Sequence, residues 1–138
     1  MEKPAGKTAS QVRTLADWLG IAASTACAIH CIFVPSLLVL GTVLPAAVLD
    51  DELFHNAILW VILPAALVAF GIGCLRHKDR WVMALAAVGL GGMLLAATVL
   101  HEIGGEAVER GVTLLSAVVL VYAHYRNFRI CRSIDCAS

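Results

Sequence analysis

Charged residues are scarce in this chain, and their absence is concentrated in a few places. Asp, Glu, Lys and Arg together make up 14% of the 138 residues, whereas 60% of the residues are hydrophobic. Because soluble globular domains carry about 25% charged residues, this composition excludes an ordinary soluble domain. Four stretches contain no charged residue at all: 18–49, 53–75, 81–101 and 111–125.

The chain also lacks several sequence features, and each missing feature argues against a particular class of function. The chain has no glycine-rich nucleotide-binding loop, no internal repeat and no low-complexity segment. Its basic residues form no concentrated patch, so we expect no nucleic-acid partner. The N-terminal segment is basic but lacks a compact apolar stretch followed by a small-residue cleavage site, and we therefore expect no cleaved signal peptide.

The four uncharged stretches have lengths typical of transmembrane helices. A helix of about 20 apolar residues crosses a bilayer, and the second and third stretches match this length directly. The first is longer than one straight crossing, and the fourth is long enough if Arg110 and Arg126 reach to the interfaces. We predict an all-α integral membrane four-helix bundle in a single domain, 1–138. Its predicted helices cover about 15–45, 53–75, 81–101 and 107–127, followed by a tail at 128–138.

The basic residues predict the orientation of the bundle. All of them except Arg110 fall in three alternate segments outside the spans, whereas the other two loops are acidic. The positive-inside rule places these three segments in the cytoplasm, so both termini are predicted to be cytoplasmic and the protein to be multi-pass in the inner (plasma) membrane. The three segments contain Lys3, Lys7 and Arg13, then Arg76, Lys78 and Arg80, then Arg126, Arg129 and Arg132.

A Cys-x-x-His-Cys motif lies within the first uncharged stretch. Cys27, His30 and Cys31 are related as i, i+3 and i+4, so they are neighbours on a helix surface. Thiolate and imidazole are ligands for soft and borderline metal ions, and polar groups at membrane depth are costly and usually functional. We predict a metal site at these residues. The alternative is that the thiols pack as small hydrophobic groups and the histidine bonds a neighbouring helix.

A proline follows this motif by one turn. Pro35 cannot donate a backbone hydrogen bond to the carbonyl of Cys31. We therefore expect a helix kink at the motif, with a free carbonyl oxygen beside the thiols.

A second cysteine pair, Cys131 and Cys136, lies in the basic tail. Arg129 and Arg132 favour the thiolate form of these cysteines, and the cytosol disfavours a stable disulfide. We predict a flexible dithiol that accepts metal. The alternative is an incidental pair without a function.

Three further residues are secondary metal-site candidates. Glu52 and His55 belong to an acidic outer patch, which would raise the local concentration of cations; alternatively, acidic residues simply remain outside when basic residues are sorted inside. His124 lies one turn from Asn127. These two side chains either bond the first helix near Asp17 or complete a metal shell.

Glycines predict where helices approach closely and where the chain turns. Gly89, Gly91 and Gly92 in the third stretch predict a tight helix–helix seam, because small residues allow close packing in lipid. A substrate path along these glycines is the alternative. Gly104 and Gly105 predict an outer turn.

From Leu15 to Cys136 the chain resembles the MerC-type mercury-resistance membrane protein family, in its C-x-x-H-C branch. The resemblance lies in the four-helix layout, the cysteine motif followed by proline, and the cysteine pair in the tail. It implies that Cys27 and Cys31 bind mercuric ion, and that Cys131 and Cys136 pass it inward. Because an imidazole beside thiols also suits zinc or copper, the identity of the ion stays open.

These observations predict uptake of a thiophilic cation by ligand exchange between thiolates, without nucleotide hydrolysis and without enzymatic activity. We expect no permanently bound cofactor; the metal ion, Hg²⁺ or a Zn²⁺- or Cu⁺-like ion, is the cargo. Expected partners are membrane lipid and a cytoplasmic thiol acceptor, and a homo-oligomer is left open. The alternatives are a non-transporting metal or redox sensor, and a metal- or thiol-dependent membrane enzyme that uses Cys27 with His30.

Overall fold

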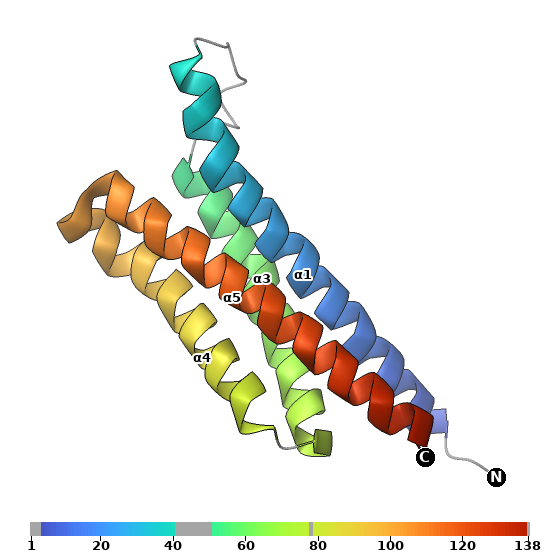
Figure 1. The fold of residues 1–138 in the computed structure, drawn as a ribbon. Coiled ribbons are helices and arrows are strands. Elements are labelled where there is room, and N and C mark those ends of the chain that lie inside the picture. Colours follow the sequence, from blue (N-terminus) through green and yellow to red (C-terminus); the bar gives the residue numbers. More distant parts are fainter. Residues whose placement is uncertain (1–3, 41–50, 78, 138) are drawn as a thin grey trace.

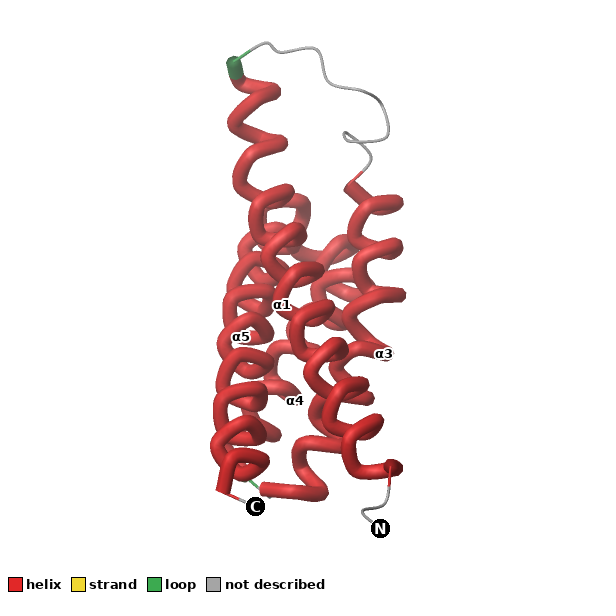
Figure 2. Tube along the Cα trace, turned by 90° about the vertical axis from the view of Figure 1, so that its right-hand side faces the viewer, coloured by secondary structure: helices red, strands yellow, loops and turns green. Residues whose placement is uncertain are grey.

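The described part of the chain is a bundle of long helices. The computed structural model describes residues 4–40, 51–77 and 79–137, and a few side chains at helix ends, including those of Glu52, Cys74 and Cys136, lie outside this description. Figures 1 and 2 show the helices running side by side, which confirms the predicted all-α four-helix bundle. The elements are α1 (Pro4–Val39), α3 (Asp51–His77), α4 (Arg80–Leu95), the π-helix η1 (Ala96–Leu100) and α5 (His101–Ala137).

The described helices have the length and composition of membrane spans. Large apolar side chains, including Trp60, Leu67 and Val88, are exposed on the outside of the bundle, as contact with lipid requires. Between the helices the buried residues are often alanine, which allows close packing. The protein is therefore a multi-pass membrane protein. The four candidate spans within the described residues are Thr8–Leu37, Leu53–Gly73, Arg80–Leu100 and Glu102–Ser133.

The order of packing places α1 and α5 at the centre of the fold. Helix α1 packs on both α3 and α5, and α4 packs mainly on α5. The start of α1 and the end of α5 lie at the same end of the bundle (Figure 1). This arrangement agrees with termini on one side of the membrane, and the prediction that this side is the cytoplasm still rests on the charge pattern.

Two helix bounds differ from the predicted ones. Helix α5 passes the expected end near residue 127 and continues to Ala137, so the segment predicted as a flexible tail is helical. The continuation is explained by His124, Asn127 and Cys131, which recur at helical spacing and are all buried. Helix α1 begins at Pro4 and continues through Pro35 to Val39, and the predicted residues 41–45 lie outside the described residues.

The predicted glycine seam is present between α4 and α5. A side chain at Gly89 would meet Leu120, and one at Gly92 would collide with the hydroxyl of Ser116, whereas Gly91 has nothing within 4 Å. The predicted turn at Gly104 and Gly105 is also confirmed, because Gly105 has φ 72° and interrupts the helical conformation inside α5; its location on the outer side of the membrane stays a prediction.

The start of α4 is fixed by a polar contact with α5. Asp79 accepts hydrogen bonds from the backbone N–H groups of Trp81 (2.8 Å) and Val82 (3.2 Å), and Arg126 donates to its other oxygen at 3.2 Å. Desolvation raises the pKa of the Asp79 carboxyl, but the two N–H groups and the guanidinium together lower it below its ordinary value. The carboxylate therefore caps α4 and ties it to α5 at the end of the bundle that holds the termini.

Candidate metal centre

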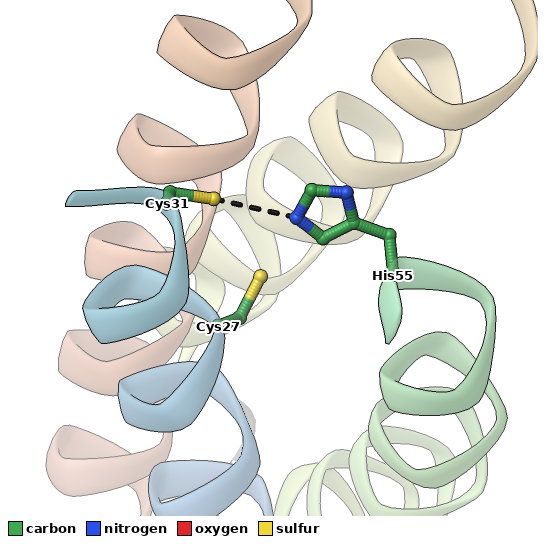
Figure 3. Close-up of side chains that lie close together, drawn as sticks. All are labelled: Cys27, Cys31 and His55. Carbon is green, nitrogen blue, oxygen red and sulfur yellow. Dashed lines mark hydrogen bonds between the residues drawn. The ribbon is translucent and has the colours of Figure 1, made fainter. Parts of the chain in front are cut away.

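Two thiols and one imidazole meet inside the bundle. The Sγ atoms of Cys27 and Cys31 and a ring nitrogen of His55 all lie within 4.8 Å of one another. Cys31 Sγ is 3.4 Å from His55 Nε2, and Figure 3 shows the three side chains converging from α1 and α3. All three are buried, and both cysteines are free thiols. Within the described ranges of the chain, this is the one such group of three metal-ligating side chains.

Helix geometry explains the placement of the two sulfurs. Positions 27 and 31 differ by about 40° around a helix, whereas position 30 is about 100° from position 31. Cys27 and Cys31 therefore point in nearly the same direction. His30 is turned away from that direction, and its ring stacks on Phe54 with 3.8 Å between the ring centroids. The structure thus places His30 beside the cluster, not among its three members.

His55 takes the imidazole position that the motif suggested for His30. A short connection between two helices makes them antiparallel neighbours. Cys31 lies ten residues before segment 41–50 and His55 lies five residues after it. The sequence therefore places both residues toward the same end of two neighbouring helices, but it does not place them at one level.

A carboxylate from α5 lies on the other side of the His55 ring. Glu109 Oε1 is 3.9 Å from His55 Nδ1, which is longer than a direct hydrogen bond but close enough for electrostatic orientation. In metal sites, a carboxylate on the far nitrogen of a histidine orients the ring toward the ion. In the sequence, Glu109 is one of several acidic residues near the start of the fourth predicted helix, and no pattern there connects it with His55.

A small cavity adjoins Cys27 and His55, and all four long helices contribute to it. Its volume is about 10 Å³, close to the minimum that holds one water molecule. The cavity is therefore so small that one bound ion would contact side chains on opposite walls. The lining residues are Cys27, His55, Ile58, Leu59, Met93, Ala97, Glu109 and Thr113.

This geometry suits a thiophilic cation. A metal–thiolate bond is about 2.3 Å long, so two sulfurs on opposite sides of one ion stand about 4.6 Å apart. The two sulfurs and the His55 nitrogen all lie within 4.8 Å of one another, so small side-chain adjustments would bring all three atoms onto one ion. Three protein ligands leave a position open for exchange.

Comparison with known protein families places most of the chain in one of them. The family described as MerC mercury resistance protein matches residues 17–129. The chain belongs to the MerC family. No curated protein and no solved structure matches it. The matched range contains both membrane cysteines, His55 and Glu109, so the cluster lies entirely within the MerC region.

A second buried polar cluster lies nearer the termini end of this MerC bundle. Asp17 Oδ1 is 3.1 Å from His124 Nδ1, and the amide of Asn127 donates to both Asp17 oxygens at 3.0 Å and to the carbonyl of Ala69 at 3.2 Å. The predicted bonding of His124 and Asn127 to the first helix is therefore present. His124 is not one of the grouped metal-ligating side chains among the described residues, and its use as a metal ligand stays a prediction.

Cys131 lies beside this second cluster. Its side chain is 0% exposed, and its Sγ is 4.0 Å from Asn127 Oδ1. The thiol is therefore enclosed by the bundle, which differs from the predicted flexible tail. The side chains of Cys136 and Glu52 lie outside the described residues, so their predicted roles stay predictions.

Proposed function

We propose that this MerC protein binds a thiophilic cation at Cys27, Cys31 and His55 and carries it across the membrane. The observation that carries the proposal is the convergence of two sulfurs and one nitrogen within 4.8 Å in the interior of a multi-pass membrane protein. Mercuric ion is the first cargo to test because the family is one of mercury resistance proteins. We propose no enzymatic activity.

Charge balance supports this cargo. A lone divalent ion at membrane depth would be strongly disfavoured because no water solvates it there. Two thiolates neutralise a divalent cation, so the dithiolate complex carries no net charge. Sulfur also binds soft ions in preference to the harder ions that are abundant in cells.

The distribution of polar side chains supports a route along α1 and α5. Most of the buried polar side chains among the described residues belong to these two helices, and we call this set the polar seam. The seam leads to Cys131 from the group of Cys27, Cys31 and His55, which we call the outer cluster. The charge pattern predicts that this direction is inward. The members of the seam are Arg13, Asp17, Ser24, Cys27, His30 and Cys31 on α1, and Thr113, Ser116, His124, Asn127 and Cys131 on α5.

We propose that ligand exchange between thiolates moves the ion from the outer cluster toward Cys131 and Cys136. Each exchange replaces one metal–sulfur bond by another, so it needs no nucleotide. A cytoplasmic thiol then accepts the ion, and we expect the protein to act in the inner membrane. The open ligand position in the outer cluster permits the incoming thiolate to bind before the outgoing one leaves.

Uptake of radiolabelled mercuric ion into cells that make the protein tests this proposal. We expect a Cys27→Ser, Cys31→Ser variant to lose uptake and a Cys74→Ser variant to retain it at equal membrane expression. His55→Ala should reduce uptake, whereas Asn56→Ala, at the exposed neighbouring position, should not. Equal uptake by the wild type and the double cysteine variant would remove the proposal.

A further inference from the structure

Met93 brings a thioether side chain into the buried cluster that contains the two thiols. Its side chain is 3% exposed and belongs to the same buried cluster as Cys27 and Cys31. It also lines the 10 Å³ cavity together with Cys27 and His55. Met93 comes from α4, so it approaches the cavity from a helix that contributes no other metal-ligating side chain to its lining.

The neighbouring backbone is unusual at this level. The π-helix η1, Ala96–Leu100, begins three residues after Met93, and Ala97 of this π-helix lines the same cavity. Short π-helical segments inside α-helices are rare and occur frequently at functional sites. The irregular turn therefore lies beside the cavity that Met93 shares with Cys27 and His55.

The other polar side chains of the cavity are less suited to complete the ligand set. Glu109 faces Nδ1 of His55, on the side of the ring away from Cys31, where it can orient the ring. Carboxylate and hydroxyl oxygens are hard ligands, whereas thioether sulfur is soft and matches the two thiolates.

We propose that the Met93 thioether is a weak fourth ligand, which an incoming thiolate displaces during exchange, and that it makes the site selective for soft cations, such as Ag⁺, Cu⁺ and Hg²⁺, over Zn²⁺. This inference rests on the proposed cation site. A thioether carries no charge and binds hard or borderline ions weakly. It therefore adds affinity for soft ions and almost none for zinc.

Nuclear magnetic resonance of methionine methyl groups tests the proposal directly. The full-length protein, labelled with ¹³C at the methionine methyls and held in detergent, is titrated with silver nitrate in chloride-free buffer. We expect the Met93 signal to shift at one equivalent of Ag⁺. The Met83 signal should stay in place, because that side chain is exposed on the same helix. Loss of the shift in the Cys27→Ser, Cys31→Ser variant would place the ion at the thiols.

Affinity measurements separate a ligand from a packing residue. Met93→Leu preserves the approximate volume of the side chain, and we expect it to weaken Ag⁺ binding about tenfold, or about 1.4 kcal/mol, with Zn²⁺ binding unchanged. Met83→Leu is the matched control and should change neither. Equal weakening of both ions would indicate packing and overturn the inference.

The outcomes also distinguish this inference from the proposed function. If Ag⁺ binds through the thiols while the Met93 signal stays in place, the fourth ligand is wrong and the cation site stands. If no Ag⁺ binds to the wild-type protein, the proposed cation site fails, and the role of Met93 fails with it.

Discussion

The imidazole ring of His124 packs directly against Gly20. A side chain at position 20 would collide with Nε2, Cε1 and Cδ2 of this ring. Phe70 covers the ring from α3 with 4.4 Å between the centroids, and Asp17 holds Nδ1. The ring is therefore fixed from three directions. The contact between α1 and α5 at this level requires a residue without a side chain.

Replacing this glycine should destabilise the bundle. We expect Gly20→Ala to lower the free energy of unfolding by about 1–3 kcal/mol, the usual effect of overpacking a core, because the methyl group displaces His124 from Asp17. Gly71→Ala is the control, since nothing lies within 4 Å of that position. The midpoint of thermal unfolding in detergent, followed by the helical circular dichroism signal, is measured for both variants. Equal midpoints would contradict the packing of His124 on Gly20.

The contact between α4 and α5 can be tested at two glycines of α4. Gly89→Ala should destabilise the protein because the new methyl group collides with Leu120 Cγ and crowds the backbone carbonyl of Ser116, whereas Gly91→Ala meets open space. We expect the Gly91 variant to be neutral or stabilised by up to about 1 kcal/mol, since alanine favours a helix over glycine. The same unfolding measurement applies, and a reversed order of stability would contradict this seam.

Orientation of His55 by Glu109 should be visible in cation affinity. We expect Glu109→Gln to weaken Zn²⁺ or Hg²⁺ binding about 10-fold, the lower end of the effects known for carboxylates behind ligating histidines. Glu106→Gln is the control because Glu106 is exposed and pairs with Arg110.

A double variant tests whether Glu109 acts through His55. In a His55→Ala background, Glu109→Gln should cause no further loss of affinity, because the ring that it orients is absent. Isothermal titration of purified protein measures all four variants. Independent, additive losses would show that Glu109 acts on the site by another route.

The Asp79 cap predicts a dependence of stability on acid. The pKa of this carboxyl is lower in the folded protein than its ordinary value of 3.8. Its contribution is therefore complete above the ordinary pKa and is lost as the pH falls through the folded one. We expect the difference in unfolding midpoint between wild type and Asp79→Asn to be larger at pH 6 than at pH 3. Glu102→Gln, an exposed control, should show no such change, and a constant difference for Asp79 would contradict the cap.

Composition alone predicted the helices and their number because lipid imposes simple requirements. A span must be long, apolar and free of charge, and the uncharged stretches show this directly. Close packing also follows from sequence where small residues cluster, as at Gly89 and Gly92. The sequence does not separate these from Gly91, because that distinction depends on which face of α4 meets α5.

The metal cluster was predicted only in part. Cys27 and Cys31 share a helix turn, so their proximity follows from spacing. His55 reaches them from another helix, and contacts between helices depend on register and rotation that a single sequence does not state. For the same reason, the sequence did not predict that Glu109 lies beside His55. The prediction that Cys131 lies in a flexible tail was wrong. It rested on the arginines that follow the last apolar stretch, although His124, Asn127 and Cys131 have helical spacing.

The enclosure of Cys131 has a consequence for delivery of the ion. A thiol at the surface would exchange with any small thiol that diffuses past it. Here the sulfur becomes reachable only when the last turns of α5 separate from the bundle, and such local opening has its own free energy and rate. Under the proposed transfer of the ion to Cys131, the frequency of that opening, and not the speed of diffusion in the cytosol, would set the rate of release.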